Sequence, residues 1–150
     1  MAGSSQNRKA AQVFRDMAGR TGNPKLAMSA IGRNAVNRHI GYYRGNGPPG
    51  DPWPALEEST ILSKAARGKT QKLVDTALLK GGYEYKATAT NVTISNRETV
   101  KVNDLQVDGV GRKHKKFKVV ATTPETDDPQ LMKDSEEILA NFLFTGKAKK

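Results

Sequence analysis

Cysteine is absent from the 150 residues of this chain, and so is any long apolar run. Without thiols the chain forms neither disulfide bridges nor thiolate metal sites, which suits a reducing compartment. No apolar stretch approaches the roughly 20 residues that span a bilayer. The polar start, Met1 to Lys9, lacks the apolar core of a signal peptide. We therefore expect a soluble protein that is made and used inside a cell, with no membrane contact.

Apolar and aromatic residues are scarce, at 36% and 6% of the chain. A single domain of this length can still bury a core without covalent staples, but that core should be small relative to the surface. Extended arms, or surfaces completed by a partner, would fit this balance. Lys and Arg number 25 against 15 Asp and Glu, a formal charge of +10. Such an excess attracts nucleic acid and acidic protein surfaces, although ordinary solvation is the alternative explanation.

Patterns of catalytic and ligand-binding residues are also lacking. His39 and His114 lie far apart in sequence and outside any metal-binding motif, so we expect each to be a surface or capping residue. The pairs Glu57-Glu58 and Glu136-Glu137 are adjacent residues that point in different directions and make poor acid–base partners. The GNGPPG segment at 45–50 lacks the Lys-Ser/Thr of a phosphate-binding loop. We predict that the protein is not an enzyme and has no catalytic residue, cofactor or metal.

Helical patterns begin the chain. We predict a short helix over Lys9–Ala18, within an N-terminal arm of residues 1–22. Asn23-Pro24 is a helix-start signal, and a longer helix should run from there to Tyr43. An extended loop at 45–72, rich in glycine and proline at its start and partly helical from Glu57 to Lys72, should follow. The apolar residues of the longer helix recur at roughly helical spacing: Leu26, Ala30, Ile31, Val36 and Ile40.

Short strands are predicted next. Tyr83 and Tyr85 alternate with polar residues, which indicates a half-buried strand. A turn at Asn91 should lead into a returning strand that starts at Val92. Similar alternation predicts a third strand at 99–102 and a fourth at 117–121.

Another aspartate–proline pair, Asp128-Pro129, predicts the start of a final helix, and Gly146 its end. A basic tail, 145–150, should follow. The order of elements indicates an α+β fold: N-terminal helices, a small antiparallel β-sheet of about four strands, and a C-terminal helix packed on the sheet, all in one domain at 23–144. The expected buried stripe of the last helix is Leu131, Ser135, Ile138, Leu139, Phe142 and Leu143.

The strongest local charge is the GRKHKK segment at 111–116. We interpret it as a basic loop or hairpin tip that contacts DNA phosphate or an acidic partner; the alternative is that it only keeps the loop soluble. Sequence-specific DNA binding is not expected, because neither a recognition helix nor a base-stacking pattern accompanies it. The contacting residues would be Arg112, Lys113, Lys115 and Lys116.

The stretch from Tyr43 to Ser95 resembles the virion morphogenesis, or tail-completion, family of tailed bacteriophages. Family members have an aromatic-ending helix, a proline–glycine loop with a tryptophan, a leucine-rich turn and then a β-hairpin. Ala77 stands where the family usually has glycine, and the family's Y-A-x-x-H-x-x-G segment is not found after the hairpin. The matching positions are Tyr43, Pro49-Gly50, Trp53, Leu56, Thr60, Lys64, Leu73, Thr76, Leu78 and Tyr83 to Ile94.

The resemblance implies a structural virion protein of the neck or tail end, assembled in the host bacterial cytoplasm. Its partners would be copies of itself in a ring, with six-fold symmetry by analogy, and the head connector or head-closure protein. A tail tube or tail terminator protein, and DNA passing through the channel, would complete the set. The interaction residues would be Trp53, Leu56, Thr60 and Lys64. Trp53 has an alternative role, as a lid on the protein's own core. The alternative function is sequence-nonspecific binding of nucleic acid.

Overall fold

The computed structural model describes residues 3–45, 47–70, 78–97, 126 and 128–149. Its elements are helices α1 (Gly3–Thr21), α2 (Lys25–Gly45), α3 (Glu58–Ala66), α4 (Leu78–Gly81) and α7 (Pro129–Thr145), with strands β1 (Tyr83–Ala87) and β2 (Val92–Asn96). The fold is α+β, as the sequence predicts. Within the described residues the sheet has two strands. The expected strands at 99–102 and 117–121 lie outside those residues.

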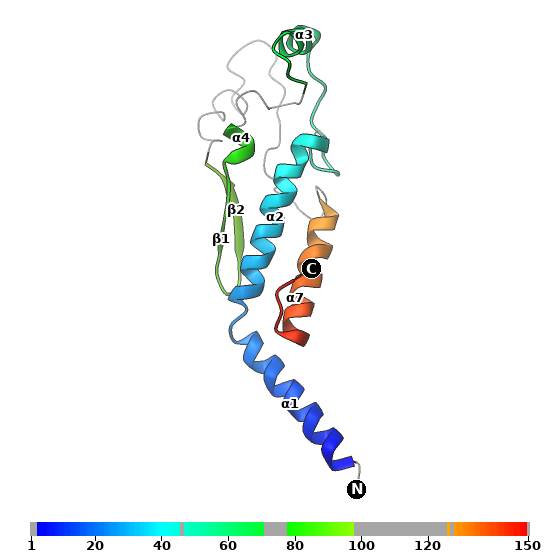
Figure 1. Cartoon of the computed structure of the whole chain (residues 1–150), viewed down its shortest axis with the longest axis vertical. Coiled ribbons are helices and arrows are strands. Elements are labelled where there is room, and N and C mark those ends of the chain that lie inside the picture. Colours follow the sequence, from blue (N-terminus) through cyan, green and yellow to red (C-terminus); the bar gives the residue numbers. More distant parts are fainter. Residues whose placement is uncertain (1–2, 46, 71–77, 98–125, 127, 150) are drawn as a thin grey trace.

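Helix α2 is the centre of the molecule. The β1–β2 hairpin packs on one side of it and α7 on the other, while α1 and α3 extend beyond its two ends (Figure 1). Among the described residues, the C-terminal helix therefore does not pack on the hairpin as predicted. Because α2 occupies the inner face of the hairpin, α7 packs against α2 instead.

The face of α2 that is buried consists of small residues at one end and aromatic rings at the other. Small side chains let a helix approach its neighbours closely. Gly32 is the extreme case: a Cβ atom there would lie 2.2 Å from Cδ2 of Tyr85 in β1. The buried residues of α2 are Ala27, Ala30, Gly32, Ala35, His39, Tyr42 and Tyr43.

The hairpin follows the predicted alternation. Its strands are antiparallel, with Tyr83 opposite Asn96 and Ala87 opposite Val92. The turn spans residues 88–91, where the backbone N–H of Thr88 donates to the carbonyl of Asn91 at 2.8 Å. Asn91 therefore ends the turn that the sequence predicts at this residue.

Helix α7 begins and ends at the residues that the sequence indicates. The side chain of Asp128 accepts a hydrogen bond from the backbone N–H of Leu131, and Pro129 occupies the first turn. Gly146 ends the helix in the left-handed conformation, with φ 75°. The predicted stripe is partly correct, because Leu131, Ile138 and Phe142 are buried while Ser135, Leu139 and Leu143 are half-buried.

The segment before α2 contains more helix than expected, and the segment after it contains a helix in the part where the sequence allows one. Helix α1 covers Gly3–Thr21 rather than only Lys9–Ala18, so the N-terminal arm is almost entirely helical. The predicted loop at 45–72 is extended near its start but contains α3. Helix α2 begins one residue later than the Asn23-Pro24 signal predicts. The carbonyl of Pro24 accepts the first hydrogen bond of the helix, which the backbone N–H of Met28 donates.

Candidate interaction surfaces

The loop after α2 holds Trp53 against the molecule. Gly47 turns the chain there with φ 122°, and a Cβ atom on it would lie 2.5 Å from the backbone nitrogen of Trp53. Only glycine takes this backbone conformation without strain at so close an approach. The N–H of Gly47 also donates to the carbonyl of Tyr42 at 2.8 Å, which fixes the loop to the end of α2.

Trp53 is a core residue of its own chain. It is 4% exposed, and its indole meets the ring of Tyr43 edge-on, with centroids 5.0 Å apart. The ring of Tyr43 in turn lies 6.2 Å from the ring of Tyr83 on the hairpin. The sequence left two roles open for Trp53, a partner contact and a lid on the protein's own core. The described residues fit the second role. Edge-to-face packing of this kind stabilises a core beyond its buried area.

The other three predicted anchors do not form one continuous site with Trp53. Leu56 and Lys64 line a small cleft of about 90 Å³ beside α3, whose other walls are Ile61, Ala65, Lys69 and Thr70. Leu56 is half-buried and Lys64 only 7% exposed, whereas Thr60 is exposed on α3. The cleft is too small for an apolar ligand of ordinary size.

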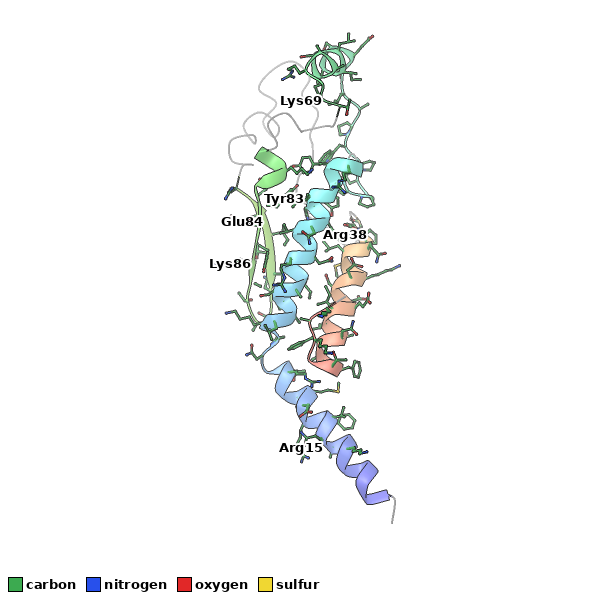
Figure 2. The ribbon with its side chains drawn as sticks, in the orientation of Figure 1. Arg15, Arg38, Lys69, Tyr83, Glu84 and Lys86 are labelled. Carbon is green, nitrogen blue, oxygen red and sulfur yellow. The ribbon has the colours of Figure 1, made fainter. Side chains whose placement is uncertain are left out.

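The predicted basic contact residues Arg112, Lys113, Lys115 and Lys116 lie outside the described residues. Elsewhere the basic side chains are spread along the molecule. Arg15 lies on the α1 arm and Lys69 lies at the opposite end (Figure 2). The basic contact loop therefore stays a prediction.

A buried ion pair joins α2 to α7, and the sequence pattern did not reveal it. Arg38 donates from Nε to Oδ2 of Asp128 at 2.7 Å and from Nη2 to Oδ1, a two-pronged contact. Tyr42 donates its hydroxyl to the same carboxylate at 2.8 Å. The Asp128 side chain is fully buried and that of Arg38 is 25% exposed. Asp128-Pro129 signalled a helix start, but nothing local indicated a partner ninety residues away.

A second carboxylate extends this network. Asp134 lies further along α7 and accepts hydrogen bonds from Asn34 at 3.3 Å and from Gln130 at 2.8 Å. The guanidinium of Arg38 is 3.8 Å from its Oδ2 atom. The polar atoms thus satisfy one another across the α2–α7 interface, which fixes the register of the two helices.

The ion pair shifts the pKa values of both Arg38 and Asp128. The hydrogen bond to Asp128 raises the pKa of Arg38. Burial by itself would raise the pKa of Asp128, but the hydrogen bonds from Arg38 and Tyr42, with the charge of Arg38, hold it below its ordinary value. Both side chains therefore stay ionised at neutral pH.

His39 is the second polar residue that the sequence did not place correctly. It was predicted as a surface or capping residue, but only 1% of it is exposed. Its Nδ1 donates to the carbonyl of Ala35 at 2.7 Å, and its ring lies 4.8 Å from that of Tyr42 and 5.4 Å from that of Tyr83. Burial lowers the pKa of His39. The neutral imidazole acts as a packing element, since so little of it is open to a substrate.

A different kind of surface lies at the lower end of the molecule. Val13 and Phe14 on α1 are 49% and 70% exposed, and Phe144 at the end of α7 is 66% exposed. Arg20, near the end of α1, donates from Nη1 to the carbonyls of Leu143 at 2.8 Å and Phe144 at 3.0 Å. This cation satisfies the last carbonyls of α7 and fixes where the arm leaves the body.

Metal-binding clusters are absent from the part of the chain that the structure describes: it holds no group of three or more His, Asp or Glu side chains that could bind a metal ion. None of the helices in this part is long and apolar enough to cross a bilayer. No family model, no curated protein and no solved structure matches the chain.

Proposed function

We propose that this protein is a non-enzymatic structural subunit of a tailed bacteriophage, placed at the head–tail junction, where it completes the tail and joins it to the head connector. The protein would be assembled in the host cytoplasm and become part of the virion. The resemblance of residues 43–95 to the tail-completion family supports this setting.

The helical arm carries the proposal structurally. Helix α1 projects from the body of the molecule and exposes Val13 and Phe14 along its length (Figure 1). Apolar side chains of this size on a projecting helix are typical of segments that are buried in an assembly. A chain with such an arm is suited to a closed ring, in which each subunit contacts the next by the same heterologous interface. We propose six subunits by analogy with the family.

The buried polar residues favour a structural role over catalysis. His39 and Asp128 are both nearly inaccessible, and each is held by a partner within the fold. A catalytic acid or base has to reach a substrate directly or through one water molecule. The cluster therefore supports a role in joining α2 to α7.

Deletion of the gene tests this function directly. In the phage that encodes the chain, the deletion should leave full heads and complete tails that fail to join, visible by electron microscopy. The purified full-length protein, alone or with the head connector, should form rings of defined mass. Infectious particles that lack the protein would rule the proposal out. So would a protein that stays strictly monomeric both alone and with the head connector.

Nucleic-acid binding is the second candidate, because the chain has a formal charge of +10. Binding should ignore sequence and weaken steeply with salt. Lys113, Lys115 and Lys116 should be changed together to Glu, and affinity for a mixed-sequence duplex measured across salt concentrations. Unchanged affinity and salt slope would remove these residues from the DNA contact. This function is compatible with the first, since DNA passes through the neck channel.

A further inference from the structure

Helix α1 has one polar side that is satisfied within the helix and one apolar side that is not covered. Gln12 donates to Asp16 at 2.7 Å and accepts from Arg15 at 3.1 Å, so these three side chains form a chain of hydrogen bonds. At 100° per residue, Val13 and Phe14 lie on the other side with the half-buried Met17. The described residues leave Phe14 70% exposed.

The outer side of α7 is equally well defined. Leu131, Ile138 and Phe142 are buried on the inner side of this helix, which packs against α2. The exposed residues recur at helical spacing along the opposite side, with two acidic residues in the middle and an aromatic ring at the end. They are Lys133, Glu136, Glu137, Ala140 and Phe144.

These two surfaces are complementary. Helix α1 has four basic residues and one acidic, and the exposed Lys9 is the cation beside the apolar side, since Arg20 is bonded to its own α7 and Arg15 lies on the polar side with Asp16. Helix α7 has three acidic residues and one basic, and Glu136 and Glu137 are exposed. Both surfaces carry apolar groups beside the charges. The helices also match in length, about 28 Å and about 26 Å at 1.5 Å per residue.

The arm does not reach this surface on its own chain. The hydrogen bonds from Arg20 to the carbonyls of Leu143 and Phe144 place the end of α1 at the end of α7. From that point α1 runs away from the body (Figure 1). Among the described residues, the outer side of α7 is thus open to an arm from elsewhere.

We infer that the α1 arm of one copy docks along the outer side of α7 of the next copy. Val13 and Phe14 would lie against Ala140 and Phe144, and Lys9 beside them would face Glu136 and Glu137. The contact is heterologous, since each copy gives one arm and receives another, and such contacts close into rings. This inference deepens the function proposed above by naming the joining surfaces, and it rests on that proposal for its biological setting.

Charge reversal tests the pairing with the full-length protein. Lys9→Glu in one variant, and Glu136→Lys with Glu137→Lys in another, should each weaken self-association at low salt by at least about tenfold. An equal mixture of the two should associate again, because every arm then meets an α7 of opposite charge. Mass photometry and analytical ultracentrifugation would measure both effects, and circular dichroism would check that each variant is folded.

A matched control separates the contact from net charge. Lys25→Glu with Arg33→Glu removes two exposed positive charges from α2, outside both surfaces, and should leave self-association unchanged. An equal loss in this control, or no rescue in the mixture, would overturn the inference.

Because the chain has no cysteine, cross-linking gives an independent result. A variant with Phe14→Cys and Ala140→Cys should form a ladder of disulfide-linked copies under oxidising conditions, and each single variant should give at most dimers. A cross-linked monomer would mean that the arm folds back on its own chain, and would overturn the inference. Failure of the double-cysteine variant to form a ladder, together with binding of the wild-type monomer to anionic vesicles, would also overturn the inference.

The two proposals fail in different ways. If the ladder does not form but the deleted phage still makes unjoined heads and tails, the α1–α7 contact is wrong and the function stands. If the ladder forms but the particles are complete without the protein, the contact stands and the phage function is wrong.

Discussion

The close approach of α2 to the hairpin at Gly32 gives a prediction with an internal control. Any side chain at this position would enter the ring of Tyr85, since a Cβ atom would lie 2.2 Å from Cδ2 and 2.6 Å from Cγ. Non-bonded carbon atoms prefer about 3.5–4.0 Å. Cγ lies on the axis of ring rotation about χ2, so turning the ring leaves this contact in place, and relief needs a new χ1 rotamer or a movement of β1. Gly32→Ala should therefore push α2 and the hairpin apart.

Gly41 provides the comparison, because it lies in the same helix and a Cβ atom there would have nothing within 4 Å. Replacing glycine by alanine in a helix stabilises it by about 1 kcal/mol when nothing else changes. Both variants should receive this gain, but only Gly32→Ala also suffers overpacking, which costs about 1–3 kcal/mol. Gly41→Ala should thus be more stable than the wild type, and Gly32→Ala less stable than Gly41→Ala by about 1–3 kcal/mol.

Urea unfolding followed by circular dichroism measures these differences. Adding Tyr85→Ala should remove the clash, so the double variant should lose less stability than the two single changes predict together. If Gly32→Ala stabilises the protein as much as Gly41→Ala does, or if the Tyr85 change shows no coupling, the reasoning about this contact is refuted.

Three further predictions concern the buried side chains. Trp53→Ala should lower the free energy of unfolding by about 3–5 kcal/mol, and the fluorescence of the single tryptophan should shift to the red when the wild type unfolds; unchanged stability would contradict its burial. Arg38→Met should cost about 3 kcal/mol by leaving a buried carboxylate unpaired. Because the pKa of Asp128 is lowered from 3.8, its contribution is complete above pH 3.8 and is lost as the pH falls below it; the acid-unfolding curve of Arg38→Met should lack this component. Because burial lowers the pKa of His39 from 6.5, the unfolded chain takes up its proton first, so stability should fall below pH 6.5, and His39→Gln should flatten that part of the pH profile.

Local signals in the sequence predicted the elements whose ends are chemically marked. Asp128-Pro129 and Gly146 bound α7, and the alternation that includes Tyr83 and Tyr85 marks β1, because capping and burial on one face depend on neighbouring residues. The same approach found the core face of α2 only in part. Of the residues it selected, Leu26 is 67% exposed, Ala30 is buried, and Ile31, Val36 and Ile40 are half-buried.

The core face of α2 is instead set by partners that are distant in sequence. Gly32 is buried because Tyr85 approaches it, and Arg38 is partly buried because Asp128 accepts its hydrogen bonds. Periodicity counts apolar residues and therefore misses small or charged residues whose burial depends on tertiary contacts. The predicted anchors were affected in the same way: Trp53 was proposed as a partner contact or a core lid, and Tyr43 of the same chain packs against it.

The position of α2 between the hairpin and α7 also has a consequence for synthesis on the ribosome. The buried carboxylate that pairs with Arg38 is ninety residues further along the chain, so α2 leaves the exit tunnel long before Asp128 does. Until then the side of α2 that packs against α7 lacks that helix. Completion of the body, and with it the anchoring of the arm by the last carbonyls of α7, therefore waits until α7 has been synthesised.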